Sequence, residues 1–147
     1  MHELAIRTVG LTRRCGGRLV VDEVGLEVPR GAVYGLLGPK GAGKTTVIRL
    51  LLGLLRPDAG RVELLGAAPS RASLSRIGAL VGAPGFYPHL TGRENLEVTR
   101  RLLGLRSTAI ADALAAVRLT GDAGQRVAGY SLATRQRLAL ARALLPR

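Results

Sequence analysis

Apolar residues in the first third of the chain come in short runs bounded by glycine, proline and charged residues. Such runs predict strands rather than helices. The predicted strands span residues 4–6, 19–21, 25–28 and 33–37, with a turn at Gly16–Gly17 after the first. The run at 33–37 is typical of a strand buried on both faces of a sheet. Two later runs, at 61–65 and 77–81, predict further strands.

Helical spacing first appears after this β-rich part. It predicts a helix over 45–55 that Pro57 ends. Thr91 and Glu94 have capping-box spacing, which predicts a helix running to about Leu103. One apolar face predicts the next helix, and its members are Ile110, Ala113, Leu114 and Val117. A last helix over 133–145 is predicted to have Ser131 as its cap.

Composition narrows the class of protein. A chain of 147 residues with 47% apolar content forms at most one domain with a real core, built mainly from aliphatic residues. No apolar run is long enough to cross a membrane, and the first residues do not have the pattern of a signal peptide. Cys15, the single cysteine, cannot form an internal disulfide, which suits a reducing cytoplasm.

The net charge of +12 raises the possibility of a nucleic-acid partner. The arginines, however, are spread along the whole chain, and both lysines, Lys40 and Lys44, lie in one short motif. We therefore do not expect nucleic-acid binding.

That motif predicts a phosphate-binding loop. The stretch from Gly38 to Thr45 matches G-x-x-x-x-G-K-[ST] and lies between an apolar run and a helix. Small residues let backbone N–H groups surround an anion, and the helix adds its positive end. The expected nucleotide-binding residues are Gly38, Pro39, Lys40, Gly41, Ala42, Gly43, Lys44, Thr45 and Thr46. Lys44 can reach the β- and γ-phosphates, and the Thr45 hydroxyl can ligate Mg²⁺. Kinases, GTPases, helicases and transporter motors share this loop, so it leaves the use of the nucleotide open.

Three later stretches narrow the choice: RVELLG, IGALVGAPGFYPHLTGRENL and YSLATRQRLALARALL. Together with the phosphate loop they resemble the ATP-binding cassette subunits of ABC transporters, most of all the bacterial branch linked to export of bacitracin and lantibiotics. The resemblance implies an α/β fold of the P-loop NTPase class with an N-terminal antiparallel β portion and a helical subdomain. Residues up to about 82 would form the β-rich part and residues 90–147 the helical part. The family's C-terminal strands would be lacking.

The resemblance also implies partners and roles. The signature segment Ser131, Leu132 and Ala133 would contact the γ-phosphate of ATP held by a second cassette subunit, in a homodimer or heterodimer. Phe86, Tyr87 and the following helix would lie near a transmembrane permease subunit; ordinary loop packing is the alternative for those two aromatics. ATP and Mg²⁺ would be the cofactors, and Lys44 would stabilise phosphate charge during catalysis. The subunit would be cytoplasmic, on the inner face of the cell membrane, and would energise export of a drug or peptide.

Several residues depart from the family pattern. Cys15 stands where an adenine-stacking aromatic is expected, which predicts weaker base binding. Gly82 replaces a Gln or Glu near Mg²⁺ and the attacking water, Ala133 replaces the signature glycine, and Lys40 replaces Asn.

The family further continues past Arg147 to an apolar strand that ends in Asp-Glu. A similar pattern occurs earlier, in the run Leu19-Val20-Val21-Asp22-Glu23, but the resemblance places this run in an outer antiparallel strand away from the nucleotide. Asp22 and Glu23 are expected in a solvated turn. We therefore expect this chain alone to hydrolyse ATP poorly or not at all. The alternative function is a non-hydrolysing interaction module made from a truncated or degenerate cassette. A small-molecule kinase is disfavoured by the match over 130–145.

Overall fold

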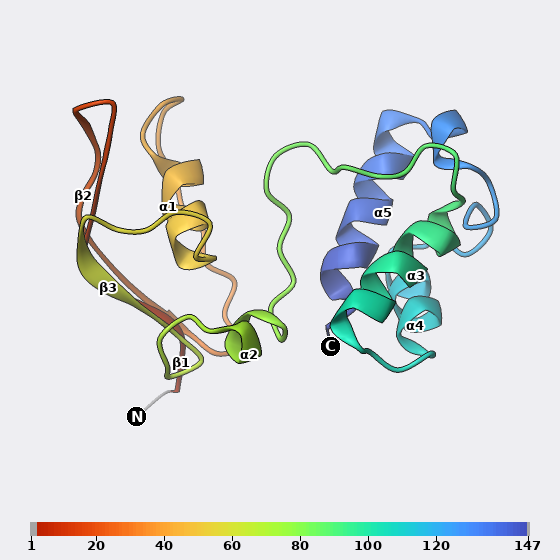
Figure 1. The fold of residues 1–147 in the computed structure, drawn as a ribbon, viewed down its shortest axis with the longest axis horizontal. Coiled ribbons are helices and arrows are strands. Elements are labelled where there is room, and N and C mark those ends of the chain that lie inside the picture. The colour runs from red at the N-terminus through yellow and green to blue at the C-terminus, as the bar shows by residue number, and fades with distance from the viewer. Residues whose placement is uncertain (1–2, 147) are drawn as a thin grey trace. The chain divides into compact units, whose positions relative to one another are not determined.

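The computed structural model describes residues 3–146 (Figure 1). The chain divides between Leu74 and Ser75 into two compact units, one rich in strands and one helical. We describe each unit by itself. Within residues 3–146, no helix combines the length and apolarity that crossing a membrane requires.

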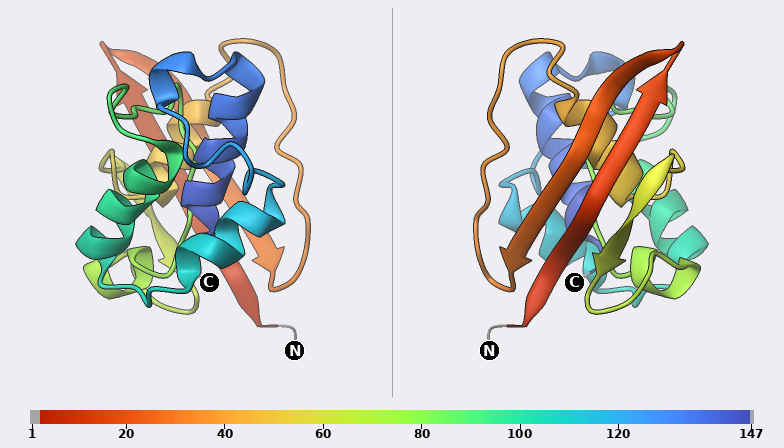
Figure 2. Two further views of the ribbon diagram at one scale, coloured as in Figure 1. Left: turned by 90° about the vertical axis from the view of Figure 1, so that its right-hand side faces the viewer. Right: turned by 90° about the vertical axis from the view of Figure 1, so that its left-hand side faces the viewer.

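An antiparallel sheet forms most of the first unit. Strands β1 (Leu4–Cys15) and β2 (Arg18–Pro29) make a hairpin around Gly16–Gly17, and β3 (Ala59–Leu64) pairs with the other edge of β1. The strand order is therefore β2-β1-β3 (Figure 2). The strand predicted at 4–6 is confirmed but extends to Cys15, and the runs at 19–21 and 25–28 belong to one strand, β2, rather than two. The strand at 61–65 is confirmed and begins two residues earlier than expected.

Helix α1 (Lys44–Leu51) covers one face of this sheet (Figure 2). Val47 and Leu50 of α1 are buried with apolar residues that alternate along the strands. These strand residues are Leu11, Val21, Leu26, Val28, Val62 and Leu64. Burial of this aliphatic face on a single helix drives the folding of the unit.

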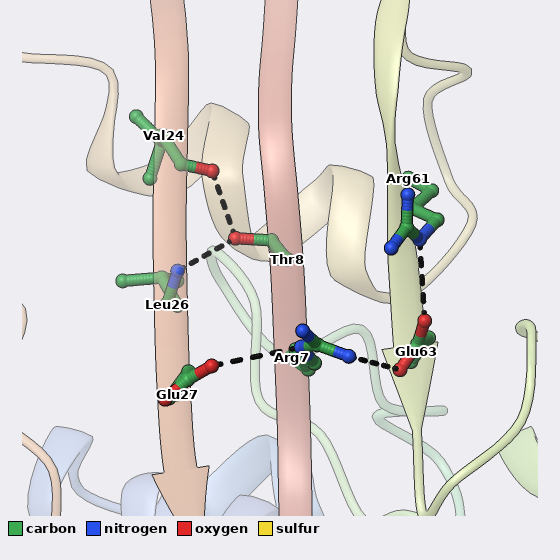
Figure 3. A network of polar contacts seen from close by, with 7 residues as sticks. All are labelled: Arg7, Thr8, Val24, Leu26, Glu27, Arg61 and Glu63. Carbon is green, nitrogen blue, oxygen red and sulfur yellow. Dashed lines mark hydrogen bonds and ion pairs between the residues drawn. The ribbon is translucent and has the colours of Figure 1, made fainter.

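Polar contacts link neighbouring strands (Figure 3). The hydroxyl of buried Thr8 donates to the carbonyl of Val24 and accepts from the N–H of Leu26, both at 2.9 Å. It thereby joins β1 and β2 next to a register shift in their ladder. Arg7 lies 3.6 Å from Glu27 and 3.8 Å from Glu63, and these exposed pairs contribute little to stability.

Two predicted strands are wrong. Residues 33–37 form an extended segment outside any strand, in which Leu37 is 92% exposed and Val33 is fully exposed. Residues 77–81 are also irregular. A strand of a buried parallel sheet needs a hydrogen-bonded neighbour. Among the described residues neither run pairs with a strand.

Helix α1 ends earlier than predicted because of Gly53. This residue has a φ of 67°, and its N–H donates to the carbonyl of Leu50. The N–H of Leu54 donates to the carbonyl of Arg49, which completes a Schellman motif. The glycine therefore ends α1 before Pro57. The short helix α2 (Arg71–Leu74) was not predicted.

The second unit packs helices α3 (Gly92–Leu103), α4 (Ala109–Ala116) and α5 (Leu132–Leu144) around one apolar core, with a 3₁₀ turn at Val127–Gly129 (Figure 1). Its fully buried leucines are Leu96, Leu114, Leu119, Leu138 and Leu145. All three predicted helices of this part are confirmed, with bounds shifted by a residue or so.

The capping box predicted for α3 is confirmed. The N–H of Glu94 donates to the Thr91 hydroxyl at 3.2 Å, and the N–H of Thr91 donates to the Glu94 carboxylate at 2.7 Å. The hydrogen bond from the Thr91 backbone holds the pKa of Glu94 below its usual value, because it favours the ionised carboxylate.

Candidate nucleotide-binding site

The phosphate loop, residues 38–46, is folded around the side chain of its second lysine. The Lys44 ammonium donates to the carbonyl of Gly38 at 2.6 Å and to that of Pro39 at 2.7 Å. A backbone turn, from the N–H of Ala42 to the carbonyl of Pro39 at 3.2 Å, closes the loop from inside. The positive charge of Lys44 is thus held across the loop rather than extended into solvent.

Strand β2 fixes the end of the loop where α1 begins. Gly43 is the N-cap of α1 with a φ of 82°, in the left-handed region that glycine adopts at little cost. A Cβ on Gly43 would lie 2.5 Å from the carbonyl oxygen of Val20, so only glycine fits against β2. The role of Val20 was not predicted, because nothing in the motif points to a contact with an earlier strand.

A cavity of about 280 Å³ lies over this loop and is lined by Val20 and residues 40–46. In the described chain no side chain caps the start of α1, and its first turn contains no acidic residue. The first N–H groups of a helix lack partners within the helix and carry its positive end. Together with Lys40 and Lys44, these groups make the cavity suited to a phosphate chain.

The loop also fits a phosphate-bound Mg²⁺. Thr45 is exposed and lines the cavity, and its hydroxyl is an oxygen ligand of the kind that Mg²⁺ takes. In residues 3–146 no cluster of three or more His, Cys, Asp or Glu could hold a metal ion.

The predicted signature segment begins helix α5 in the second unit. Ser131 is the N-cap: its hydroxyl accepts from the N–H of Thr134 at 3.1 Å and lies 2.8 Å from the Thr134 hydroxyl. Leu132 and Ala133 are exposed in the first turn. The predicted cap is confirmed. The segment and the phosphate loop belong to different compact units of the chain.

Because Ser131 caps α5, we expect Ser131→Ala to lower the free energy of unfolding of the second unit by about 1 kcal/mol. Ser131→Asn keeps a capping oxygen and should lower it by no more than a few tenths of a kcal/mol. Urea unfolding followed by circular dichroism measures both variants. Equal losses in both would show that the hydroxyl does not stabilise the helix as a cap.

The remaining predicted positions lie in loops or in the β1–β2 hairpin. Cys15 is exposed at the end of β1 and is not among the residues that line the cavity. Gly82 is exposed, with a φ of 70°. Phe86 packs against the helical core, whereas Tyr87 is 53% exposed and meets His89 edge to face.

The run at 19–23 is, as predicted, part of an antiparallel edge strand, β2. Asp22 and Glu23 are exposed, but they lie inside β2, so the expected turn is wrong. Glu23 has a φ of 44° at a register shift in the β1–β2 ladder, and β2 continues past it to Pro29.

A sequence profile described as "ABC transporter" matches residues 21–147. The chain belongs to the ABC transporter family. Among its curated relatives is the bacitracin transport ATP-binding protein BcrA of Bacillus licheniformis, 42% identical over 144 residues that make up 95% of this chain and 47% of the relative. The daunorubicin resistance ATP-binding protein DrrA3 of Streptomyces coeruleorubidus is 42% identical over 99% of this chain and 48% of its own length.

A solved ATP-binding subunit of an ABC transporter has the same fold, with a TM-score of 0.84 over 96% of this chain and 62% of that chain. Its 24% identity supports the fold alone. The predicted α/β fold of the ABC ATP-binding class is thereby confirmed. The chain spans about half the length of the curated relatives it matches.

Proposed function

We propose that this ABC transporter family member binds MgATP at residues 38–46, as part of an ATP-binding subunit. The observation that carries the proposal is the fit of Gly43 against the Val20 carbonyl, which sets the loop at the start of α1. The adjoining cavity offers two lysines and the uncapped helix end to a phosphate chain. This combination favours a polyphosphate over a singly charged anion.

In this function Lys44 stabilises negative charge on the β- and γ-phosphates, and its bonds to the Gly38 and Pro39 carbonyls hold the ammonium in place beforehand. Thr45 is the residue that would hold Mg²⁺, which when bound neutralises phosphate charge. Lys40, exposed on the rim of the cavity, adds a second cation without a fixed partner among the described side chains.

ATP hydrolysis by this chain alone is proposed to be slow. Gly82 occupies the position at which the family places Gln or Glu near the attacking water, and it offers no side-chain oxygen. Ala133 adds a methyl group to the signature segment. These residues support a second candidate function. In it, the chain binds nucleotide and pairs with a complete cassette but does not hydrolyse ATP itself.

The relatives suggest the process that the nucleotide would serve. Their names refer to bacitracin transport and daunorubicin resistance. We propose export of a drug or peptide through a separate membrane subunit, with this chain on the cytoplasmic side and paired with a second cassette. The exposed signature segment Ser131–Ala133 would face the nucleotide of that second cassette.

Titration of MgATP into the chain by calorimetry tests the proposed site. We expect Lys44→Ala to weaken binding by about tenfold to a hundredfold, because hydrogen bonds to charged groups contribute about 1.5–3 kcal/mol. Lys40→Ala is the matched control in the same loop and should weaken binding by less than about fivefold, as an exposed charge is worth no more than about 1 kcal/mol.

Circular dichroism of both variants checks that each one folds. Binding that survives Lys44→Ala unchanged, or a folded wild-type chain that does not bind MgATP, would contradict the proposed function.

A further inference from the structure

The loop at residues 85–91 is held firmly although it has no regular structure. Asn95 is 4% exposed and clamps the loop from α3: its amide oxygen accepts from the N–H of Tyr87 at 2.8 Å, and its amide nitrogen donates to the Tyr87 carbonyl at 3.1 Å. Backbone bonds from Val127 to the Leu90 carbonyl and from Ala128 to the Pro88 carbonyl hold the other side.

Arg142 makes a further attachment, from α5. Its guanidinium donates to the carbonyl of Gly85 at 2.9 Å and lies 4.7 Å from the centre of the Phe86 ring. Burial lowers the pKa of Arg142, because desolvation disfavours the charged form. The Gly85 carbonyl oxygen and the face of the Phe86 ring offset this desolvation cost, because both interact favourably with the planar guanidinium cation.

The same helix carries the signature segment. Helix α5 is 13 residues long, starts next to Ser131 and buries Leu138 and Ala141 in the helical core. A helix anchored in this way moves as a rigid body, so its first turn and Arg142 move together.

We propose that Arg142 is a positioning residue that fixes the 85–91 loop, and with it the exposed Tyr87 and His89, to helix α5. Any displacement of the signature segment is then passed to the loop through Gly85 and Phe86. The use of Tyr87 and His89 as a surface for the membrane subunit rests on the proposed function, whereas the attachment itself does not.

A tryptophan at position 87 provides a local probe, because the natural chain contains none. Time-resolved fluorescence anisotropy of the Tyr87→Trp chain measures how freely the introduced indole moves on the nanosecond scale. Adding Arg142→Gln should raise the amplitude of this local motion about twofold, since the loop loses both contacts at its start. Arg142→Lys keeps a cation but not the planar fork, and should restore the parent amplitude only in part.

Arg137→Gln is the matched control, because Arg137 is an exposed arginine on the same helix. Phe86→Leu removes the ring face but keeps an apolar side chain in the core, and should raise the motion even if Arg142→Gln does not fold. Amide exchange in α4 should stay as in the parent, whereas a general loosening of the unit would raise it as well. Unchanged anisotropy in Arg142→Gln or Phe86→Leu, or a rise that α4 shares, would overturn the proposal.

MgATP binding of the same variants separates this proposal from the proposed function. Affinity should not change in Arg142→Gln, because the phosphate loop lies in the other unit. A chain that binds no MgATP but loses loop order in Arg142→Gln would refute the nucleotide function and leave the role of Arg142 standing.

Discussion

Gly43→Ala is expected to weaken MgATP binding by at least about a hundredfold, which corresponds to about 2.8 kcal/mol. Alanine at a φ of 82° costs about 1–2 kcal/mol in the folded chain. Its Cβ would also lie 2.5 Å from the Val20 carbonyl, so either β2 or the start of α1 must shift. Because Lys44 and the first N–H groups of α1 follow directly, that shift misplaces the groups that would contact phosphate. Calorimetric titration with MgATP measures the loss.

Gly41→Ala separates the close approach from the backbone conformation. Gly41 has a φ of 87°, close to that of Gly43, but a Cβ there would meet nothing within 4 Å. We expect a loss of about tenfold, from backbone strain alone. If the two variants lose affinity equally, the contact between Gly43 and Val20 does not set the geometry of the site.

Helix starts were predictable from sequence because their signals are local. Thr91 and Glu94 form their capping box within one turn, and Ser131 binds the N–H of Thr134, so both starts depend only on neighbouring residues. The end of α1 was also encoded locally, in Gly53, but the more obvious Pro57 drew the predicted boundary further along.

Whether residues 33–37 and 77–81 form strands could not be decided from their own sequence. Their aliphatic composition suits a buried strand, but a strand forms only where another one pairs with it. The hairpin strands β1 and β2 find each other across Gly16–Gly17, which is a local event. The two wrong runs have no neighbouring strand in the described chain, and a sequence window contains no information about such a neighbour.

For the candidate site too, only the features formed by residues that are neighbours along the chain were predictable. The motif at 38–45 identified the loop, the lysine and the start of α1, because all of these are contiguous. The Val20 carbonyl behind Gly43 and the Phe86 ring beneath Arg142 were missed. Each is far from its partner along the chain, and the contact exists only after the fold has formed.

Leu114→Ala is expected to lower the free energy of unfolding of the helical unit by about 3–4 kcal/mol. Leu114 is 0% exposed in α4 and belongs to the core that α3 and α5 complete. Truncation removes buried apolar surface and leaves a cavity, and the helices around it can collapse only in part. A loss of this size is a large fraction of the stability of a small domain, so amides of α4 and α5 should exchange far faster. Urea unfolding measures the loss of unfolding free energy, and hydrogen exchange followed by mass spectrometry measures the faster exchange of the amides.

Leu102→Ala is the matched control, because Leu102 lies on α3 and is 78% exposed. It should change the free energy of unfolding by less than about 0.5 kcal/mol. Exchange in β1 and β2 should be the same in both variants, since those strands form a separate compact unit with its own core. If Leu114→Ala increased exchange in β1 and β2 as much as in α5, the two units would unfold together, and the stability of the phosphate loop would depend on the helical core.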